Sequence, residues 1–285
     1  MIDTSFLDQM ERFNLVVHKR VTSNYTGPRR SIALGRGIVF KEHRIYAPGD
    51  DFRSIDWKVY ARTDDLYIKG YEEERNLVVH VILDYSASMG FGKNTTKFDY
   101  GAMLGIGFAY LAMKENEKFM FSTFSEDLEI FQPRRGMSQI AAMVQHINSL
   151  KPNGNSRIND AMMHYKKIVG SRAMIVLVSD FLISINEIVD ALYHLGSGKG
   201  HEVKVIQVLD PLEVKLNIEG DFKLKDSETG ERMRTYISTR LRQEYQRKIE
   251  EHSAKIEEVC NKLGISFHLI TTDKPLFDSF YEILK

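Results

Sequence analysis

Three oxygen-bearing side chains follow an apolar segment in the pattern Asp84-x-Ser86-x-Ser88. The apolar residues 81–83 directly precede them, within a segment 77–83 that is typical of a buried strand. In extended backbone, residues two apart project to the same side, so the three side chains are expected to converge at the carboxyl end of this strand. Carboxylate and hydroxyl oxygens are the ligands that hard divalent ions prefer, which predicts a Mg²⁺ site, with Mn²⁺ and Ca²⁺ as alternative ions.

This pattern resembles the metal-ion-dependent adhesion site of von Willebrand factor A domains. In that family, a threonine on a second loop and an aspartate after a later strand complete the site. The resemblance assigns the second position to Ser156, within residues 153–161, and the third to Asp180, which follows the apolar run 175–178. Serine keeps the hydroxyl but lacks the methyl that stiffens the threonine rotamer, so weaker or more plastic metal binding is expected.

A second resemblance lies upstream of this strand. The residues that carry it are Gly35-Arg36-Gly37, the segment from Phe40 to Trp57 that contains Pro48-Gly49-Asp50-Asp51 and Ile55-Asp56-Trp57, and Ala61-Arg62. They are similar to the signature of the bacterial domain-of-unknown-function family 58, and the similarity covers nearly the whole chain. This resemblance implies that a MoxR-type AAA+ ATPase is the partner and that the pair acts as a chaperone or assembly system.

The elements that must position these side chains follow an α/β pattern. Strands are expected at residues 77–83, 119–124, 173–178, 203–209 and 265–270, with a short edge strand at 128–131 and helices that include 98–114 and 237–263. This alternation predicts a Rossmann-like von Willebrand factor A domain, a mostly parallel sheet with helices on both faces. Ligands bind at the carboxyl edge of such sheets. Gly101, Gly105 and Gly107 lie inside one helix and are expected to allow close packing on the sheet.

The chain is expected to contain two parts and an insertion. Residues 1–75 form an N-terminal α+β extension with a helix near 5–19 and short strands such as 66–71, and residues 76–285 form the main domain. An insertion at about 212–237 contains a β-hairpin at residues 222–234 with a polar loop at 226–231. In the extension, His43 and the aspartates 50, 51 and 56 have groups that exchange protons or bind metal. The favoured alternative is that neighbouring arginines pair with them and fix the loops.

Composition limits the classes of partner. Lysine plus arginine and aspartate plus glutamate number 39 each, so the net charge provides no field for nucleic acid or anionic lipid. The single cysteine, Cys260, is expected to be a core thiol in a reducing compartment. The N-terminus lacks a signal-peptide pattern, and the apolar runs are shorter than the ~20 residues that span a bilayer. We therefore expect a cytoplasmic protein without membrane insertion.

The favoured function is a protein-binding module that presents Mg²⁺ to an acidic side chain of a partner. It is not expected to be an enzyme, because Ser86 lies outside any Gly-x-Ser-x-Gly nucleophile elbow and the histidines lack zinc-site spacing. One alternative is a Mg²⁺-dependent phosphohydrolase that uses the same aspartates. Another is a metal-free interaction scaffold in which Ser86 and Ser88 only satisfy backbone groups at the sheet edge.

Overall fold

The structure, a computed structural model of the 285-residue chain, divides into two compact units. It describes residues 9–11, 34–35, 39–47, 50–72, 77–132, 134–170, 173–196, 201–225, 230 and 232–285. The larger unit contains Met1–His18 and Leu77–Lys285, and the smaller unit contains Lys19–Asn76. Of the helix expected near residues 5–19, residues 9–11 are helical and Met10 is buried in the larger unit's core, while the rest lies outside the described residues.

In the described part of the larger unit, a six-stranded sheet forms the centre. Its strands are β4 (Val78–Asp84), β5 (Lys118–Phe124), β6 (Leu128–Ile130), β7 (Ala173–Ser179), β8 (Glu202–Leu209) and β11 (Ser266–Thr271), each within one residue of its expected ends. They lie in the order β11-β8-β7-β4-β5-β6, and only the β5–β6 pair is antiparallel. Counted along the chain, this is the 3-2-1-4-5-6 order of Rossmann-type folds, which confirms the expected fold class. The order reverses between β4 and β7.

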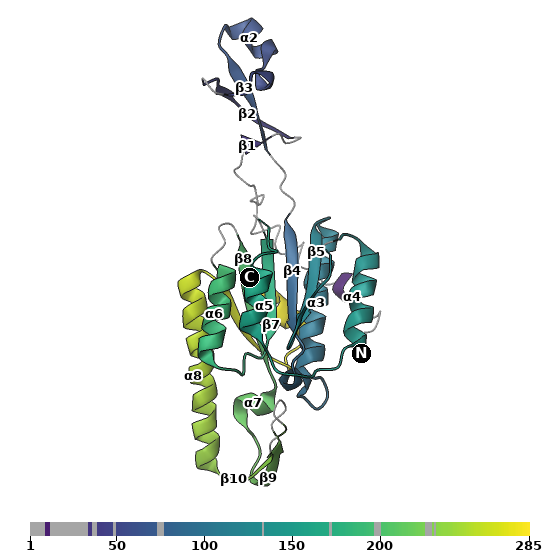
Figure 1. Ribbon diagram of the computed structural model, residues 1–285, viewed down its shortest axis with the longest axis vertical. Helices are drawn as coiled ribbons and strands as arrows, with labels where there is room; N and C mark the ends of the chain where they lie inside the picture. Colours follow the sequence, from purple (N-terminus) through teal and green to yellow (C-terminus); the bar gives the residue numbers. More distant parts are fainter. Residues whose placement is uncertain are drawn as a thin grey trace. The chain divides into compact units, whose positions relative to one another are not determined.

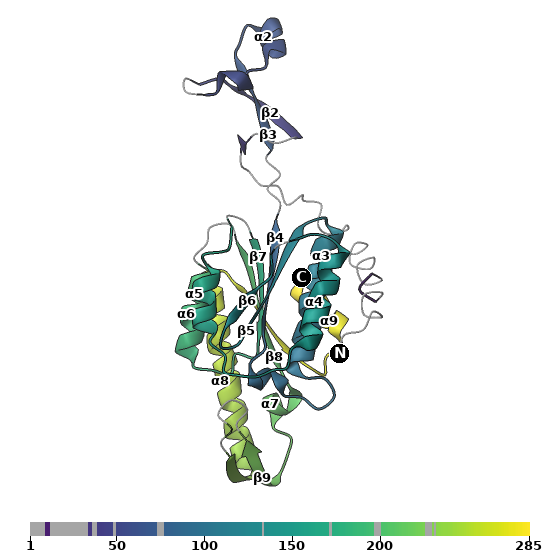
Figure 2. The same cartoon turned by 45° about the vertical axis from the view of Figure 1, so that its right-hand side comes forward.

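Helices cover both faces of this sheet (Figures 1 and 2). One face carries α3 (Lys97–Lys114), α4 (Met137–Ser149) and α9 (Leu276–Ile283), and the other carries α5 (Ile158–Tyr165), α6 (Ile185–Gly196) and α8 (Thr239–Leu263). Cys260 is a free, buried thiol on α8, as expected. No helix in the described ranges is both long and apolar enough to cross a bilayer.

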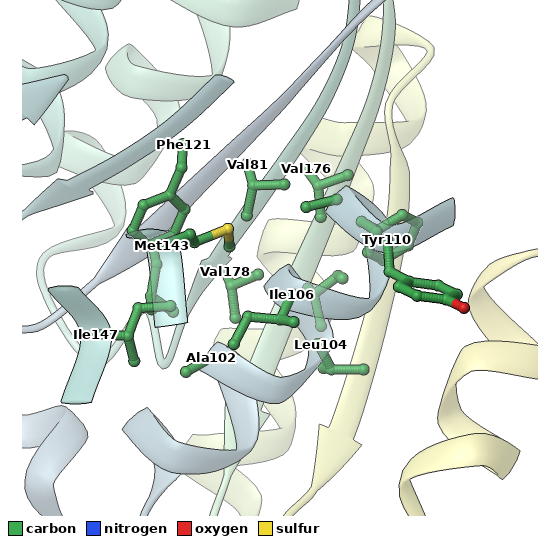
Figure 3. Packing of buried hydrophobic residues seen from close by; sticks show 14 of the residues in the cluster. Val81, Ala102, Leu104, Ile106, Tyr110, Phe121, Met143, Ile147, Val176 and Val178 are labelled. Carbon is green, nitrogen blue, oxygen red and sulfur yellow. The ribbon is translucent and has the colours of Figure 1, made fainter. Parts of the chain in front are cut away.

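The surroundings of β4 show why the central strands are almost entirely apolar. Val79, Val81 and Leu83 belong to the buried cluster under α3, α4 and α9, whereas Ile82 belongs to the cluster under α5, α6 and α8. Figure 3 shows Val81 among side chains of β7, α3 and α4 in the first cluster. Because helices cover both faces, successive side chains are buried on alternate sides and the strand has no solvent-facing side.

Helix α3 approaches its neighbours closely at three glycines. A Cβ atom at Gly101 or Gly105 would lie 2.9 or 2.8 Å from a valine methyl group of a strand, so these two glycines allow the expected close packing on the sheet. Gly107 differs from this expectation, because a Cβ atom there would lie 2.0 Å from Cζ of Phe280 in α9. Gly107 therefore makes room for an aromatic ring of a neighbouring helix and not for a strand.

A β-hairpin is inserted between β8 and α8, as predicted. After β8, α7 (Pro211–Lys215) leads into β9 (Gly220–Lys225), which pairs antiparallel with β10 (Arg232–Ile237). Loop residues 226–229 and 231 lie outside the described residues. Ile237 is 1% exposed and Met233 on the same face is 61% exposed, so only the base of this hairpin face packs against the protein. Because β8 runs parallel to β4 and β7, α7 and the hairpin follow the same carboxyl edge of the sheet (Figures 1 and 2).

The described part of the smaller unit is a three-stranded antiparallel sheet with two short helices. The strands are β1 (Leu34–Gly35), β2 (Val39–Ile45) and β3 (Tyr67–Glu72), and η1 (Phe52–Ser54) and α2 (Trp57–Thr63) lie between β2 and β3. Helix α2 was not expected from the sequence. Asp56 caps it by accepting a hydrogen bond from Lys58 N at 3.0 Å, and its other oxygen lies 3.0 Å from His43 Nε2. These contacts begin a helix within the segment of charged residues.

Substituting Gly107 by alanine tests the close approach of α9. In an ordinary helix interior, this change stabilises by about 1 kcal/mol. Here the new methyl group overlaps the Phe280 ring, so we expect the free energy of unfolding to fall by about 1–3 kcal/mol, measured by urea denaturation. In an F280A background, which lacks the ring, G107A should be neutral or stabilising. Equal effects in both backgrounds would contradict the proposed overlap.

Candidate functional site

Asp84 is the last residue of β4, and the chain turns directly after it. Ser86 is the N-cap of the 3-10 helix η2 (Ala87–Gly90), and its backbone N donates a hydrogen bond to Asp84 Oδ1 at 2.8 Å. Ser88 lies within η2, and its hydroxyl oxygen is 3.2 Å from that of Ser86. The structure thus brings the three side chains together. The expectation of continued extended backbone was wrong, because a tight turn held by the Asp84 carboxylate causes their convergence.

The second loop is joined to the first by backbone and side-chain hydrogen bonds. Ser156 Oγ donates to Asp84 Oδ2 at 2.9 Å. The backbone N of Ala87 donates to Gly154 O at 2.9 Å, and the backbone N of Asn153 donates to Tyr85 O at 3.0 Å. Ser156 is 7% exposed and lies two residues before α5. These bonds place its hydroxyl beside the carboxylate at the end of β4.

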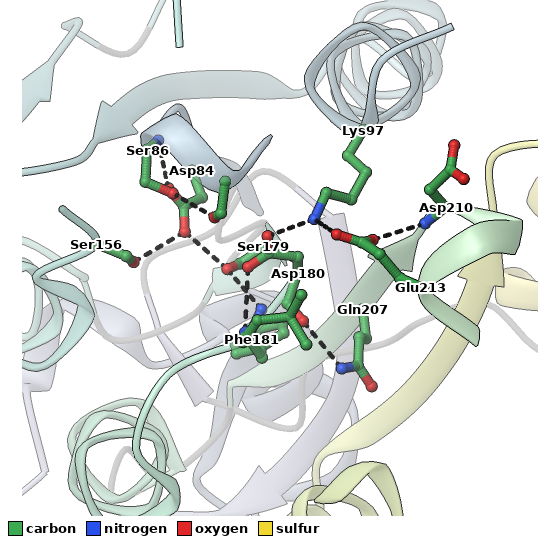
Figure 4. Close-up of polar contacts among 12 residues, drawn as sticks. Asp84, Ser86, Lys97, Ser156, Ser179, Asp180, Phe181, Gln207, Asp210 and Glu213 are labelled. Atoms are coloured by element: carbon green, nitrogen blue, oxygen red, sulfur yellow. Dashed lines mark hydrogen bonds and ion pairs between the residues drawn. The ribbon is translucent and has the colours of Figure 1, made fainter. Parts of the chain in front are cut away.

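Ser179 is the last residue of β7, and Asp180 begins the third loop directly after it (Figure 4). Ser179 Oγ donates to Asp84 Oδ2 at 2.7 Å and accepts a hydrogen bond from Phe181 N at 3.0 Å. Asp180 Oδ1 accepts a hydrogen bond from Leu182 N at 3.1 Å. Asp84 and Asp180 therefore lie on either side of the point where the strand order reverses, which is where ligands bind in open α/β sheets.

A buried lysine, which the sequence analysis did not single out, completes the arrangement. Lys97 is fully buried in the first turn of α3, with Nζ 2.7 Å from Asp180 Oδ2 and 2.5 Å from Glu213 Oε1. The second oxygen of Glu213 accepts a hydrogen bond from Asp210 N at 2.9 Å. A cation in the first helical turn opposes the helix dipole, and this was the available sequence signal for a special role. No comparable signal marked Glu213 or Ser179.

Buried carboxylates outnumber the buried cation in this network. Asp84, Asp180 and Lys97 are each at most 1% exposed, and the Glu213 side chain is 14% exposed. Burial, and next the charge of Asp180, raise the pKa of Asp84 to about 6. Burial also raises the pKa of Glu213, against the opposing effect of Lys97. When all three carboxyl groups are ionised, their negative charge exceeds that of the single ammonium, and a bound cation would offset this surplus.

The oxygen atoms around Asp84 fit a hard divalent cation. The hydroxyl groups of Ser86 and Ser156 contact the carboxylate from two loops, the Ser88 hydroxyl lies 3.2 Å from that of Ser86, and Asp180 supplies a second carboxylate nearby. Within the described residues, no group of three or more His, Cys, Asp or Glu side chains is arranged to hold a metal. Serine hydroxyls would therefore have to supply part of the coordination, which Mg²⁺ accepts together with water.

Replacing Lys97 by methionine tests its role in this network. Methionine keeps much of the side-chain volume but leaves Asp180 and Glu213 buried without their cation, so we expect the free energy of unfolding to fall by about 3–5 kcal/mol. The matched control is K93M, which removes an exposed lysine from the same connection and should change it by less than about 0.5 kcal/mol. Similar urea midpoints for the two variants would show that the ion pairs are dispensable.

Comparisons with known proteins identify sequence relatives of the chain. The family model "Protein of unknown function DUF58" matches residues 42–255. The uncharacterised protein Mb1516 of Mycobacterium bovis is 26% identical over 277 residues, which cover 95% of this chain and 86% of that protein. The uncharacterised protein MAV169 of Mycobacterium avium is 35% identical over 104 residues, which cover 36% of this chain and 59% of that protein.

Solved structures with lower sequence identity are also similar. An aerotolerance-related membrane protein from Bacteroides fragilis is 19% identical, with 73% of this chain and 96% of that chain covered and a TM-score of 0.47. BatB from Bacteroides thetaiotaomicron is 16% identical, with 73% and 98% covered and a TM-score of 0.44. The vWF domain of the pilus tip protein Mfa5 from Porphyromonas gingivalis is 11% identical, with 73% and 95% covered and a TM-score of 0.36. Because the family model spans most of its length, the chain belongs to the DUF58 family.

Proposed function

We propose that the protein is a metal-dependent protein-binding module of the von Willebrand factor A type. The residues that would hold Mg²⁺, or Mn²⁺ or Ca²⁺ in its place, are Asp84, Ser86, Ser88, Ser156 and Asp180. The observation that carries this proposal is the buried Asp84 carboxylate, on which serine hydroxyls from separate loops converge beside a second carboxylate. Their surplus negative charge favours a cation at this position.

The surrounding residues favour recognition of an acidic partner. When bound, the ion would supply a coordination position that accepts a carboxylate oxygen of another protein. Serine hydroxyls are neutral ligands, and Lys97 already engages Asp180 at 2.7 Å. Both features limit the negative charge in direct contact with a bound ion, although the whole network carries a surplus. A carboxylate from outside would then complete the coordination of the ion.

We infer that the protein binds a partner and does not catalyse a reaction. The hydroxyl groups of Ser86 and Ser156 make hydrogen bonds with Ser88 and Asp84, and neither contact is with a histidine that would act as a general base. The family resemblance favours a MoxR-type AAA+ ATPase as the partner, in chaperone-like assembly. The single cysteine is a buried free thiol, which fits a protein that functions in a reducing compartment such as the cytoplasm.

One observation favours a second candidate, a metal-free scaffold. Asp84 already accepts hydrogen bonds from Ser86 N, Ser156 and Ser179, and Lys97 is already bound to Asp180. Such contacts stabilise a buried carboxylate without an ion. In this alternative, partner binding does not depend on divalent cations, so a chelator separates the two candidates.

Calorimetric titration with Mg²⁺ tests the metal site. We expect saturable binding by the wild-type protein and none by D84A, because that substitution removes the carboxylate to which the three loops are bonded. S88A should bind more weakly, since it removes one hydroxyl and leaves the Asp84 hydrogen bonds intact. At about 100 times the dissociation constant, Mg²⁺ should stabilise the wild-type fold by about 2.7 kcal/mol.

The control for this titration is D160N, which removes an exposed carboxylate from α5, the helix after the Ser156 loop. It should bind Mg²⁺ as the wild type does. Identical titrations of wild type and D84A would refute the metal site. S88A also covers the case in which D84A fails to fold, because a weaker titration by a folded variant still reports on the site.

Partner capture tests the functional proposal directly. Immobilised wild-type protein should retain a purified MoxR-type AAA+ ATPase from the same organism in Mg²⁺ and release it in EDTA, because the proposed contact passes through the ion. D84A should fail to retain it, whereas D160N should behave as the wild type. Retention that survives EDTA would favour the metal-free scaffold. Hydrolysis of a generic phosphoester in Mg²⁺, lost in D84A, would favour the phosphohydrolase alternative.

A further inference from the structure

The β9–β10 hairpin has an exposed basic face. Residues directly opposite in an antiparallel pair project to the same face, and so do alternate residues along a strand. The side chains on the face turned away from buried Ile237, here called the outer face, are Asp221, Lys223, Arg232, Arg234 and Tyr236. All five are exposed, and Tyr236 is 62% exposed. Among the side chains that the structure describes, three cations, one anion and one aromatic ring therefore share this face.

The charge arrangement of the outer face opposes the hairpin's own stability. Arg234 lies directly opposite Lys223 in the register, and like charges in that relation destabilise a strand pair. Asp221 offsets part of this repulsion, with its Oδ2 2.5 Å from Arg234 Nη2 and 3.2 Å from Arg234 Nε. Among the described residues, neither Lys223 nor Arg232 makes an ion pair. Hairpin stability alone does not explain these two exposed cations, whereas an anionic partner would.

The hairpin follows α7, whose Glu213 binds the same lysine as Asp180 of the candidate metal site. Glu213, which binds Lys97, lies in α7, and eight residues further along the chain Asp221 begins the outer face. Eight residues span at most about 28 Å, so one extended segment of a partner is long enough to contact both places. Both lie at the carboxyl edge of the sheet (Figures 1 and 2).

We propose that the outer face of the hairpin binds an acidic segment of the same partner protein whose carboxylate would reach the candidate site. This inference rests on the proposed function. It adds that the partner carries several acidic side chains and not only the one that would reach the metal. Arginine and tyrosine are residue types enriched in protein interfaces, which favours a protein ligand. The chain's balanced net charge argues against a nucleic-acid surface.

The test uses fluorescence anisotropy with a labelled peptide of alternating glutamate and serine, in about 0.05 M salt with EDTA. The full-length double variant K223Q/R232Q should bind this peptide roughly three- to tenfold more weakly than the wild type, as expected for the loss of two exposed charge contacts. The matched control K166Q/K167Q removes two exposed lysines after α5, at the opposite edge of the sheet, and should bind as the wild type does. Because K223Q relieves like-charge repulsion, the hairpin variant should melt no lower than the wild type.

The outcomes separate this inference from the metal proposal. Equal affinities of wild type and K223Q/R232Q, including no detectable binding by either, would overturn the hairpin contact. The hairpin contact would also be overturned if the wild type bound an oligothymidylate more tightly than the peptide and the hairpin substitutions abolished that oligothymidylate binding. Adding Mg²⁺ should strengthen peptide binding by the wild type and not by D84A. If Mg²⁺ changes neither while the hairpin difference persists, the metal site fails and the acidic contact at the hairpin stands.

Discussion

The buried carboxylate of Asp84 is the group on which the candidate site depends. A carboxylate removed from water is stable only if hydrogen bonds or charges compensate for its lost hydration. Here Ser86 N, Ser156 Oγ and Ser179 Oγ donate to it over 2.7–2.9 Å, and each donor belongs to a different segment of the chain. The three segments therefore share one acceptor. Their mutual placement follows from the needs of a single side chain at the end of β4.

The helices and strands with a clear hydrophobic pattern could be predicted from the sequence, whereas the contacts between distant segments could not. Strands such as β7 are apolar throughout because helices cover both sheet faces, and this pattern is visible in the residues themselves. Asp84, Ser86 and Ser88 were found by spacing, although the turn that brings them together was not. Lys97 lies 83 residues before Asp180 and 116 before Glu213, so no local pattern shows these contacts. Helix α2 was missed because it is short and depends on its Asp56 cap.

Equal numbers of acidic and basic residues conceal a local separation of charge. The sequence correctly indicated no net charge, but net charge says nothing about where individual charges gather. The tertiary fold brings Asp180 and Glu213 to Lys97 and places Asp84 near Asp180. The hairpin register gathers Lys223, Arg232 and Arg234 on one exposed face. One region is buried and rich in carboxylates, and the other is exposed and basic. Both features arise from tertiary pairing and cannot be seen in composition.

Lys97 connects the candidate site to two neighbouring helices. Its ammonium group joins the first turn of α3 to the loop after β7 and to α7, which leads the chain into the hairpin. A cation bound beside Asp180 would compete electrostatically with the ammonium for the same carboxylate. If this competition weakened the Lys97–Asp180 contact, Lys97 would interact more strongly with Glu213. Glu213 forms the capping box of α7 together with Asp210. Binding of an ion would therefore be linked to the anchoring of α7 through one buried side chain, and linkage of this kind acts in both directions.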